Sequence, residues 1–174
     1  MLLGKNIRLR PVEPSDIDFI YTLENESSAW RVSNTFIPYS RFQIEQYVLS
    51  SEHDLYAEKQ LRLVIELFNS SPAQPIGAVD LFEFDPHDLR AGLGILIIAG
   101  ERQKGYAGET IGIVKKYCFE VLNLHQIHCS ISADNTPSIN LFLNHGFVQN
   151  GTMKEWRFRD GKWKDEIMFQ LIRS

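Results

Sequence analysis

The feature that most constrains the fold of this sequence is an apolar segment followed by a glycine-rich loop and an amphipathic segment. Residues 95–98 include no polar side chain, which is typical of a strand buried on both faces of a sheet. Apolar residues at spacings of three and four predict a helix over 107–122, and residues 126–131 predict the next strand. A strand, a helix and a strand in this order pair in parallel through a right-handed crossover. The sequence therefore predicts an α/β fold, of the α+β kind, with at least one parallel pair of strands.

The segments on either side of this unit predict one mixed sheet. Alternating or β-branched runs predict further strands, and helical spacing predicts two helices near the N-terminus and a short one after residue 134. The expected strands lie at 7–10, 61–68, 75–85, 90–98, 126–131, 152–159 and 164–172. A chain of 174 residues is too short for two ordinary domains. We therefore expect a single domain over residues 1–174, with a sheet of about seven strands flanked by about four helices.

Composition and charge exclude several classes of function. With 18 Lys and Arg against 22 Asp and Glu, the formal net charge is −4, so we expect no nucleic-acid partner. No apolar run approaches the roughly 20 residues of a membrane helix, and no secretory signal begins the chain, so we expect a cytoplasmic protein without a membrane partner. Cys118 and Cys129 are expected to be buried apolar residues. His125 and His128 face opposite sides of a strand, so we expect no metal.

The loop at residues 100–108 is the strongest candidate for a binding site. Small residues at Gly105, Ala107 and Gly108 leave the backbone N–H groups of a helix N-terminus open to an anion, such as a phosphate-bearing cofactor. Tyr106 and Ala107 stand where a P-loop needs Lys and Ser or Thr, and the dinucleotide fingerprint G-x-G-x-x-G is missing. From the residues alone, a loop that only connects strand to helix is the alternative.

This loop resembles that of the GNAT N-acetyltransferases, whose pattern Arg/Gln-x-x-Gly-x-Gly/Ala is matched by Arg102-Gln103-Lys104-Gly105-Tyr106-Ala107. The resemblance covers nearly the whole chain, through Arg90-Ala91, Asn135 and Gly146-Phe147 to Asp160-Gly161-Lys162-Trp163. It is strongest for the branch of bacterial spermidine/spermine acetyltransferases and ribosomal-protein N-terminal acetyltransferases. The resemblance implies a GNAT-like fold in which the fourth and fifth strands are parallel and splayed, with acetyl-CoA as co-substrate.

The resemblance also implies which residues bind coenzyme A. In similar proteins the pantetheine arm lies between the splayed strands, and the pyrophosphate rests on the loop. The implied residues are Ile95, Leu96 and Ile97 through their main chain, Arg102, Gln103, Lys104, Gly105, Tyr106, Ala107 and Gly108 of the loop, and Asn135, Ser138, Asn140 and Phe142 after the fifth strand. For Asn135 an ordinary start of a helix is the alternative, with Thr136 as the expected N-cap.

Similar enzymes hold an amine against the thioester, so that it attacks directly in a ternary complex. Asp80 and Glu83 are the candidate catalytic bases, and a carboxylate on the apolar side of a strand is costly unless it is used or paired. The alternative is that either acid only pairs with Arg90 or another cation.

Two positions depart from the pattern of the family. Phe142 replaces the tyrosine that is expected to protonate the departing thiolate. Gly92 stands where an acidic residue often follows the alanine matched by Ala91. A thiol has a pKa of about 8.5, so its thiolate leaves without full acid assistance, and the loss of the tyrosine is expected to slow the reaction rather than prevent it.

The expected function is transfer of an acetyl group from acetyl-CoA to a primary amine, with a polyamine such as spermidine as the favoured acceptor. Asp16, Asp18, Glu24 and Glu26 are candidates to receive a polycation, although a solvated helix face explains them as well. The alternatives are a ribosomal-type protein N-terminus or an antibiotic amine as acceptor, and a catalytically weak acyl-CoA-binding or polyamine-sensing module. The expected partner is a small-molecule amine or a peptide N-terminus, and the resemblance permits a homo-oligomer.

Overall fold

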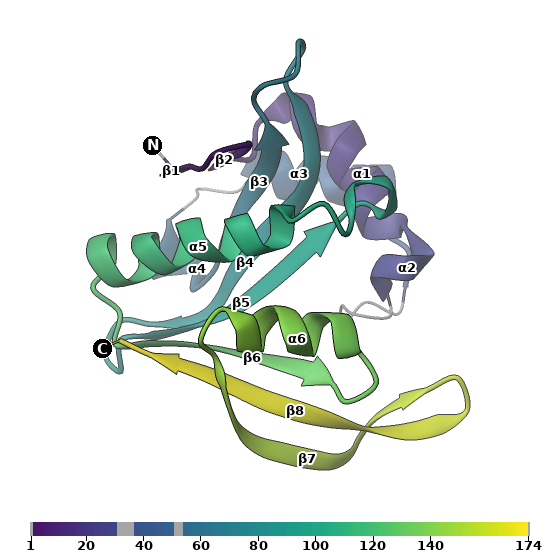
Figure 1. Ribbon diagram of the computed structural model, residues 1–174. Helices are drawn as coiled ribbons and strands as arrows, with labels where there is room; N and C mark the ends of the chain where they lie inside the picture. Colours follow the sequence, from purple (N-terminus) through teal and green to yellow (C-terminus); the bar gives the residue numbers. More distant parts are fainter. Residues whose placement is uncertain (1, 31–36, 51–53, 174) are drawn as a thin grey trace.

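The computed structural model describes residues 2–30, 37–50 and 54–173, and these form one eight-stranded sheet (Figure 1). The strand order is β1-β2-β3-β4-β5-β6-β8-β7. The strands are β1 (Leu2–Leu3), β2 (Ile7–Pro11), β3 (Leu61–Leu67), β4 (Gln74–Asp85), β5 (Arg90–Ile97), β6 (Gln126–Ser132), β7 (Val148–Arg159) and β8 (Lys162–Ile172). The seven predicted strands are confirmed, and β1 adds a two-residue strand that pairs with β2.

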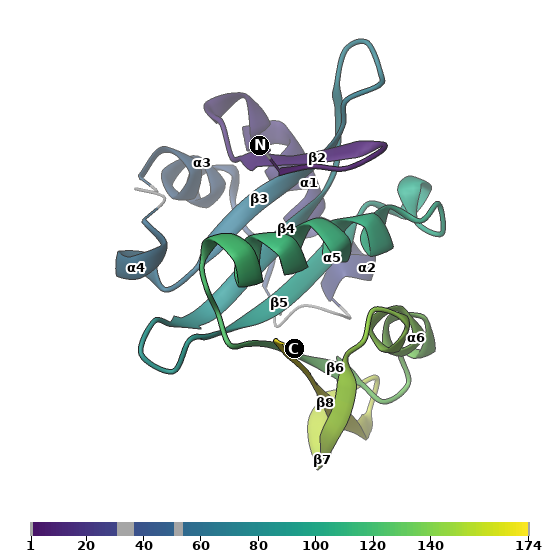
Figure 2. The same ribbon diagram turned by 60° about the vertical axis from the view of Figure 1, so that its left-hand side comes forward.

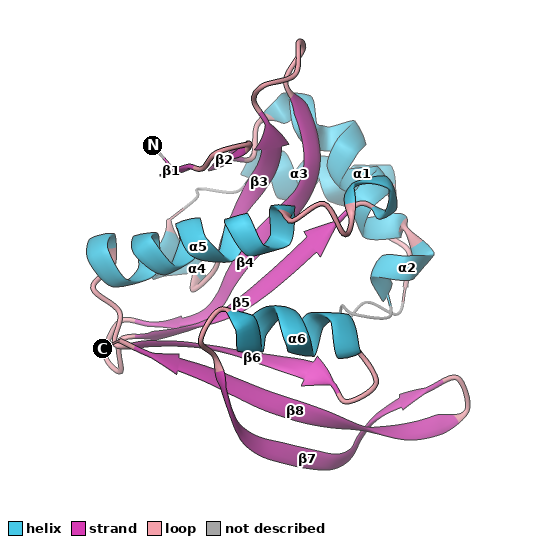
Figure 3. Cartoon of the chain, viewed as in Figure 1, coloured by secondary structure: helices cyan, strands magenta, loops and turns pink. Residues whose placement is uncertain are grey.

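Helices cover both faces of this sheet, as Figures 1, 2 and 3 show. α5 (Tyr106–Lys116) and α6 (Thr136–Asn144) lie on one face, and α1 (Ile17–Asn25) and α3 (Arg41–Ser50) lie on the other. The chain also forms two single-turn helices, α2 (Ser27–Trp30) and α4 (Leu55–Glu58). The sequence pattern does not predict these, because four residues are too few to show a helical period. Within the described ranges, no helix has the length and apolar character needed to cross a membrane.

The helix expected over 107–122 changes type part-way. The α-helical hydrogen bonds end at Lys116, and the chain continues as a π-helix over Tyr117–Val121. Apolar spacings of three and four do not distinguish a π-turn from an α-turn, so the sequence pattern overextends α5. Ile111 and Val114 of the α-helical part are buried against the sheet, as their spacing predicts.

Two apolar cores hold the sheet between the helices. In β3, Leu63 and Ile65 belong to the larger core, which includes Ile111 of α5. Val64, between them, belongs to a second core with Ile20 of α1. Successive side chains of a strand point to opposite faces, so both faces of β3 are buried.

The parallel pair β5–β6 is short, and the two strands then diverge. Only Arg90, Ala91 and Gly92 of β5 pair with β6, opposite residues 126–128. Beyond Gly92, β5 continues beside β4 to Ile97, while β6 continues beside β8 to Ser132. The predicted splay of the fourth and fifth predicted strands is therefore confirmed, and it opens the sheet at its centre (Figure 3).

Candidate functional site

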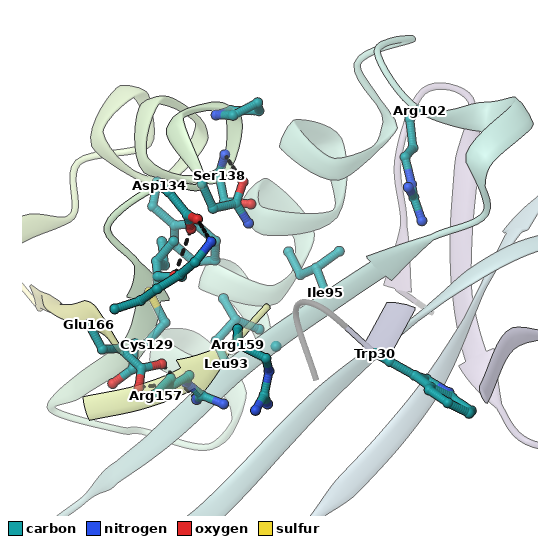
Figure 4. Close-up of a pocket in the computed structure, with 18 of the residues that line it drawn as sticks. Trp30, Leu93, Ile95, Arg102, Cys129, Asp134, Ser138, Arg157, Arg159 and Glu166 are labelled. Atoms are coloured by element: carbon teal, nitrogen blue, oxygen red, sulfur yellow. Dashed lines mark hydrogen bonds and ion pairs between the residues drawn. The ribbon is translucent and has the colours of Figure 1, made fainter. Parts of the chain in front are cut away.

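A cleft of about 750 Å³ occupies the opening between β5 and β6 (Figure 4). Its walls come from both diverging strands, from α6 and from the β7–β8 hairpin. Residues that line it include Leu93, Gly94, Ile95, Cys129, Phe142 and Glu166. Because the cleft lies where two neighbouring strands separate, main-chain groups as well as side chains face it.

This cleft passes through the sheet from one face to the other. Leu93 and Cys129 belong to the core that packs on α5. Gly94, the next residue of β5, pairs with Asp80, whose carboxylate lies on the α1 side in an ion-pair cluster with Glu24. Since side chains alternate along a strand, the lining includes residues from both faces. Two substrates can therefore approach the same point from opposite sides.

The edge of β5 that faces the cleft suits an extended amide-bearing chain. From Leu93 to Ile97, β5 pairs with β4 on one side and has no pairing with β6 on the other. Backbone N–H and C=O groups that leave water need hydrogen-bond partners, and a ligand lying along the strand can supply them. Ile95 lines the cleft directly, whereas Leu96 and Ile97 lie further along the same strand. The N–H of Ile98 donates to the carbonyl oxygen of Ile76 in β4, and main-chain direction alternates along a strand, so the main-chain groups of Leu96 also point to β4. Of the three main-chain positions inferred from the resemblance, only Ile95 and Ile97 therefore face the open edge, and the carbonyl oxygen of Ile97 accepts a hydrogen bond from Arg102.

The loop between β5 and α5 presents the N-terminus of α5 near one end of this cleft. Gln103 and Gly105 adopt left-handed conformations, with φ of 61° and 87°. A Cβ atom added at Gly105 would find open space, so the backbone there is accessible, and the positive φ itself favours glycine. Tyr106 and Ala107 begin the helix, whose first N–H groups have no partner within it. This geometry fits a phosphate, since such N–H groups bind anions.

The two cations of the loop already have partners in the structure. Arg102 lines the cleft and donates a hydrogen bond from Nε to the carbonyl oxygen of Ile97 (2.7 Å). Its guanidinium also lies 3.8 Å from a carboxylate oxygen of Glu26. Lys104 donates to Glu101 at 3.0 Å. Positive charge is therefore present at the loop but partly compensated.

Gly108 is small for a reason different from the one that the sequence suggests. A Cβ atom there would lie 3.0 Å from the imidazole ring of His145. His145 follows the last residue of α6, and its ring donates a hydrogen bond from Nδ1 to the carbonyl oxygen of Leu141 (2.7 Å). Gly108 thus allows α5 and α6 to approach each other closely.

The residues after β6 divide into two groups. Asn135 and Ser138 line the cleft, whereas Asn140 is exposed and is not part of the lining. Asn135, not Thr136, is the N-cap of α6: its side-chain oxygen accepts a hydrogen bond from the N–H of Ser138 (3.3 Å). The expectation for Thr136 is wrong because the helix already includes it as its first residue. The cap uses the side-chain oxygen of Asn135, so its amide nitrogen can still donate a hydrogen bond to another group.

The structure gives each of the two departures from the family a packing context. Phe142 of α6 is buried, lines the cleft, and packs edge-to-face on Phe147 with ring centroids 4.9 Å apart. Gly92 is covered by the ring of Phe82, and a Cβ atom at Gly92 would lie 2.3 Å from that ring. A side chain at position 92 would therefore require the ring of Phe82 to move.

The two candidate bases lie apart from each other. Both carboxylate oxygens of Asp80 accept hydrogen bonds from the guanidinium of Arg62, at 2.7 and 3.0 Å. Arg62, rather than Arg90, is the cation that pairs with Asp80, because Arg90 pairs with Asp85 across the β4–β5 turn. Glu83 has a φ of 49° in a bulge of β4 and lines a second pocket with His128. Neither carboxylate belongs to the lining of the central cleft.

The acids near the N-terminus also have arginine partners. These pairs are Asp16–Arg10, Asp18–Arg41, Glu24–Arg62 and Glu26–Arg102. Burial alone would raise the pKa of Asp16, and its hydrogen bonds from Arg10 and Glu13 hold that pKa below the ordinary value. Each of the four carboxylates already contacts an arginine, so a polycation would have to compete with that arginine for it.

Two charged pairs in the cleft wall, Asp134–Lys164 and Arg157–Glu166, are not predicted from the sequence, and the second is the more buried. Glu166 of β8 is only 2% exposed, and both of its oxygens accept hydrogen bonds from the guanidinium of Arg157 in β7, at 2.7 and 2.8 Å. Both residues line the cleft (Figure 4). The only sequence signal is a strand that begins with several charged residues, which is equally typical of an exposed hairpin.

Comparison with known proteins identifies the family. A family model described as an acetyltransferase (GNAT) domain matches residues 6–148. The chain belongs to the GNAT acetyltransferase family. As in that family, the chain is an acetyl-CoA-dependent N-acetyltransferase, and the open edge of β5 and the N-terminus of α5 fit the amides and phosphates of this co-substrate.

Relatives and solved structures with the same architecture cover nearly the whole chain. The spermidine N(1)-acetyltransferase of Vibrio cholerae is 28% identical over 99% of this chain and 96% of its own length. The spermidine N(1)-acetyltransferase of Escherichia coli K12 is 26% identical over 93% of this chain and 83% of its own. The crystal structure of the Vibrio cholerae enzyme in complex with CoA and spermine has a TM-score of 0.83, with 28% identity over 96% of this chain and 95% of that one.

Proposed function

We propose that this chain transfers the acetyl group of acetyl-CoA to a primary amine of a polyamine such as spermidine. The observation that carries the proposal is the cleft that passes through the sheet where β5 and β6 separate. The donor would enter on the side of α5 and α6, and the amine would enter on the side of α1. The relatives that are named spermidine acetyltransferases support a polyamine as the acceptor.

The cleft favours direct attack by the amine over a covalent enzyme intermediate. Cys129 is the thiol in the lining, and burial raises its pKa to about 12. It therefore stays protonated at neutral pH, and a thiol is a poor nucleophile compared with a thiolate. The thioester supplies an activated carbonyl carbon, so the chain has to orient the amine and accept its proton. An amine with a pKa of about 10.4 costs about 4.6 kcal/mol to deprotonate at pH 7.

Two other readings have specific support. A peptide N-terminus or an antibiotic amine remains an alternative acceptor, because the N-terminal acids that would receive a polycation are all paired with arginines. A catalytically weak acyl-CoA-binding or polyamine-sensing module is the second alternative, because of Phe142 and Gly92. We also propose a homo-oligomer, since a dodecameric structure is known for the similar Vibrio cholerae enzyme. The cytoplasmic location stays a prediction.

The experiment that tests the function is steady-state release of CoA thiol from acetyl-CoA. The acceptors are spermidine, spermine, putrescine, a peptide with a free N-terminus and an aminoglycoside. We expect release that depends on spermidine or spermine. If only the peptide or only the aminoglycoside causes release, the acceptor is that amine and not a polyamine. Saturable binding of acetyl-CoA without turnover would favour the binding module.

We propose Asp80 over Glu83 as the group that takes the proton, because Asp80 lies opposite Gly94 of the cleft lining. Asp80→Asn is expected to lower the free energy of unfolding by about 1–3 kcal/mol, since Arg62 loses a charged acceptor. If Asp80 also accepts the proton, kcat per folded molecule falls and its dependence on pH flattens on the acidic side. The measurement is a pH profile of kcat with a parallel urea titration.

Glu83→Gln is the matched variant for this test. Glu83 is an exposed carboxylate on the same strand, and it lines the second pocket. The Glu83→Gln substitution is expected to leave both the free energy of unfolding and the pH profile of kcat unchanged. A loss of kcat in Glu83→Gln, with a normal kcat in folded Asp80→Asn, would show that Glu83, and not Asp80, accepts the proton.

A further inference from the structure

A carboxylate in the first turn of α5 connects this helix to the turn between β1 and β2. Oε1 of Glu109 accepts hydrogen bonds from the backbone N–H groups of Asn6 (2.7 Å) and Ile7 (3.3 Å). Oε2 accepts a third from the side-chain amide of Asn6 (2.9 Å). α5 also packs against β1 and β2, which lie beside it in Figure 2. Glu109 thus attaches the start of the helix to the edge of the sheet.

The turn that receives Glu109 is itself closely fixed. The N–H of Gly4 donates to the carbonyl oxygen of Ile7 at 2.8 Å. Ile7 is fully buried and pairs with Leu67 of β3. A Cβ atom at Gly4 would lie 2.2 Å from Oε1 of Glu109, so the turn leaves no space around this oxygen. The carboxylate is therefore held by a turn that has its own hydrogen bond and a fully buried residue.

An acid at this place needs an explanation, because it lies one turn from backbone N–H groups that suit a phosphate. Like charges repel, so a free carboxylate there would oppose an incoming phosphate. The N–H groups of Asn6 and Ile7 instead compensate the charge of Glu109 on the sheet side. Burial alone would raise the pKa of Glu109, and these hydrogen bonds hold it below the ordinary value. The charge of Glu109 is therefore compensated where α5 packs against β1 and β2.

We propose that Glu109 is a positioning residue for the acetyl donor: its bonds to Asn6 and Ile7 set the direction of the α5 N-terminus, whose N–H groups would bind the phosphates of coenzyme A. The proposal rests on the proposed function of the loop at residues 102–108. It assigns no contact between Glu109 and the donor. Its effect should therefore appear in the affinity for phosphate-bearing ligands and not in the chemical step.

The test measures the binding of CoA by calorimetry to the full chain and to Glu109→Ala. We expect the Kd of CoA to rise about tenfold, which corresponds to roughly one weakened hydrogen bond to a charged group. Glu109→Gln keeps an oxygen that can accept from Asn6 and should recover part of this loss. Pantetheine, which has no phosphate, should inhibit the wild type and Glu109→Ala equally. The KM of the amine acceptor should not change.

Glu120→Ala is the matched control, since Glu120 is an exposed acid at the other end of the same helical segment. It should bind CoA like the wild type. If Glu109→Ala does not fold, Gly4→Ala tests the same contact from the other side, because its methyl group displaces the turn from Oε1. An unchanged Kd in a folded variant, or an equal loss for pantetheine, overturns the positioning role. No CoA binding by the wild type would instead overturn the proposed function of the loop.

Discussion

Phe142→Tyr is expected to raise kcat by about 10²- to 10⁴-fold, because a phenol at this position can protonate the departing thiolate. Phe142 lines the cleft between the diverging strands, and the resemblance to the family implies a tyrosine at this position. The substitution adds one oxygen at the end of a ring whose edge-to-face contact with Phe147 already fixes its orientation. The measurement is kcat with saturating acetyl-CoA and the best acceptor of the panel.

The pH profile separates an acid from a simple change in packing. A phenol with a pKa of about 10 loses its proton at high pH, so Phe142→Tyr should lose its added activity as the pH rises through that value. The wild type has no such group at this position and should show no matching decline. Phe147→Tyr is the control, because Phe147 is equally buried but does not line the cleft. An unchanged kcat in folded Phe142→Tyr, or an equal gain in Phe147→Tyr, would contradict the missing-acid interpretation.

The sequence predicts the parts of this fold that depend on local patterns. The order of strand, loop, helix and strand predicts the parallel pair β5–β6, and the glycine-containing loop predicts the accessible helix N-terminus. Resemblance to the family then predicts that these strands separate. The exact point of separation lies after Gly92, which pairs with His128. This pairing joins residues far apart in the sequence, so no local pattern shows where it ends.

Local sequence patterns do not predict which charged residues of the site contact each other. Asp80 and Glu24 share Arg62, which lies 18 and 38 positions away from them in the sequence. No local spacing relates these residues, and composition alone does not show which cation neutralises which acid. The same holds for Glu109, whose partner Asn6 is 103 positions away. The sequence thus shows which acids are candidates, whereas the fold determines which of them are paired.

Glu166→Leu is expected to lower the free energy of unfolding by about 3–5 kcal/mol, the usual cost of removing one member of a buried ion pair. Glu166 is 2% exposed, and its two hydrogen bonds with Arg157 join β8 to β7 beside a bulge in β7. The variant leaves the Arg157 guanidinium in a largely buried place without this carboxylate. The measurement is urea unfolding, with the slope of the transition checked for a change in the unfolded state.

The double variant Arg157→Met with Glu166→Leu isolates the role of the pair in binding. Apolar residues of similar volume often replace a buried ion pair without loss of stability, so the double variant should be nearly as stable as the wild type. Glu166 pairs with Ser132 of β6, which also lines the cleft. The double variant therefore removes one positive and one negative group from that wall, with no change of net charge, and keeps the wall itself. We expect the KM of the amine acceptor to change while the Kd of CoA does not. A double variant as unstable as Glu166→Leu would show that the pair is needed for folding of the hairpin, and a changed Kd of CoA would place the pair on the donor side of the cleft.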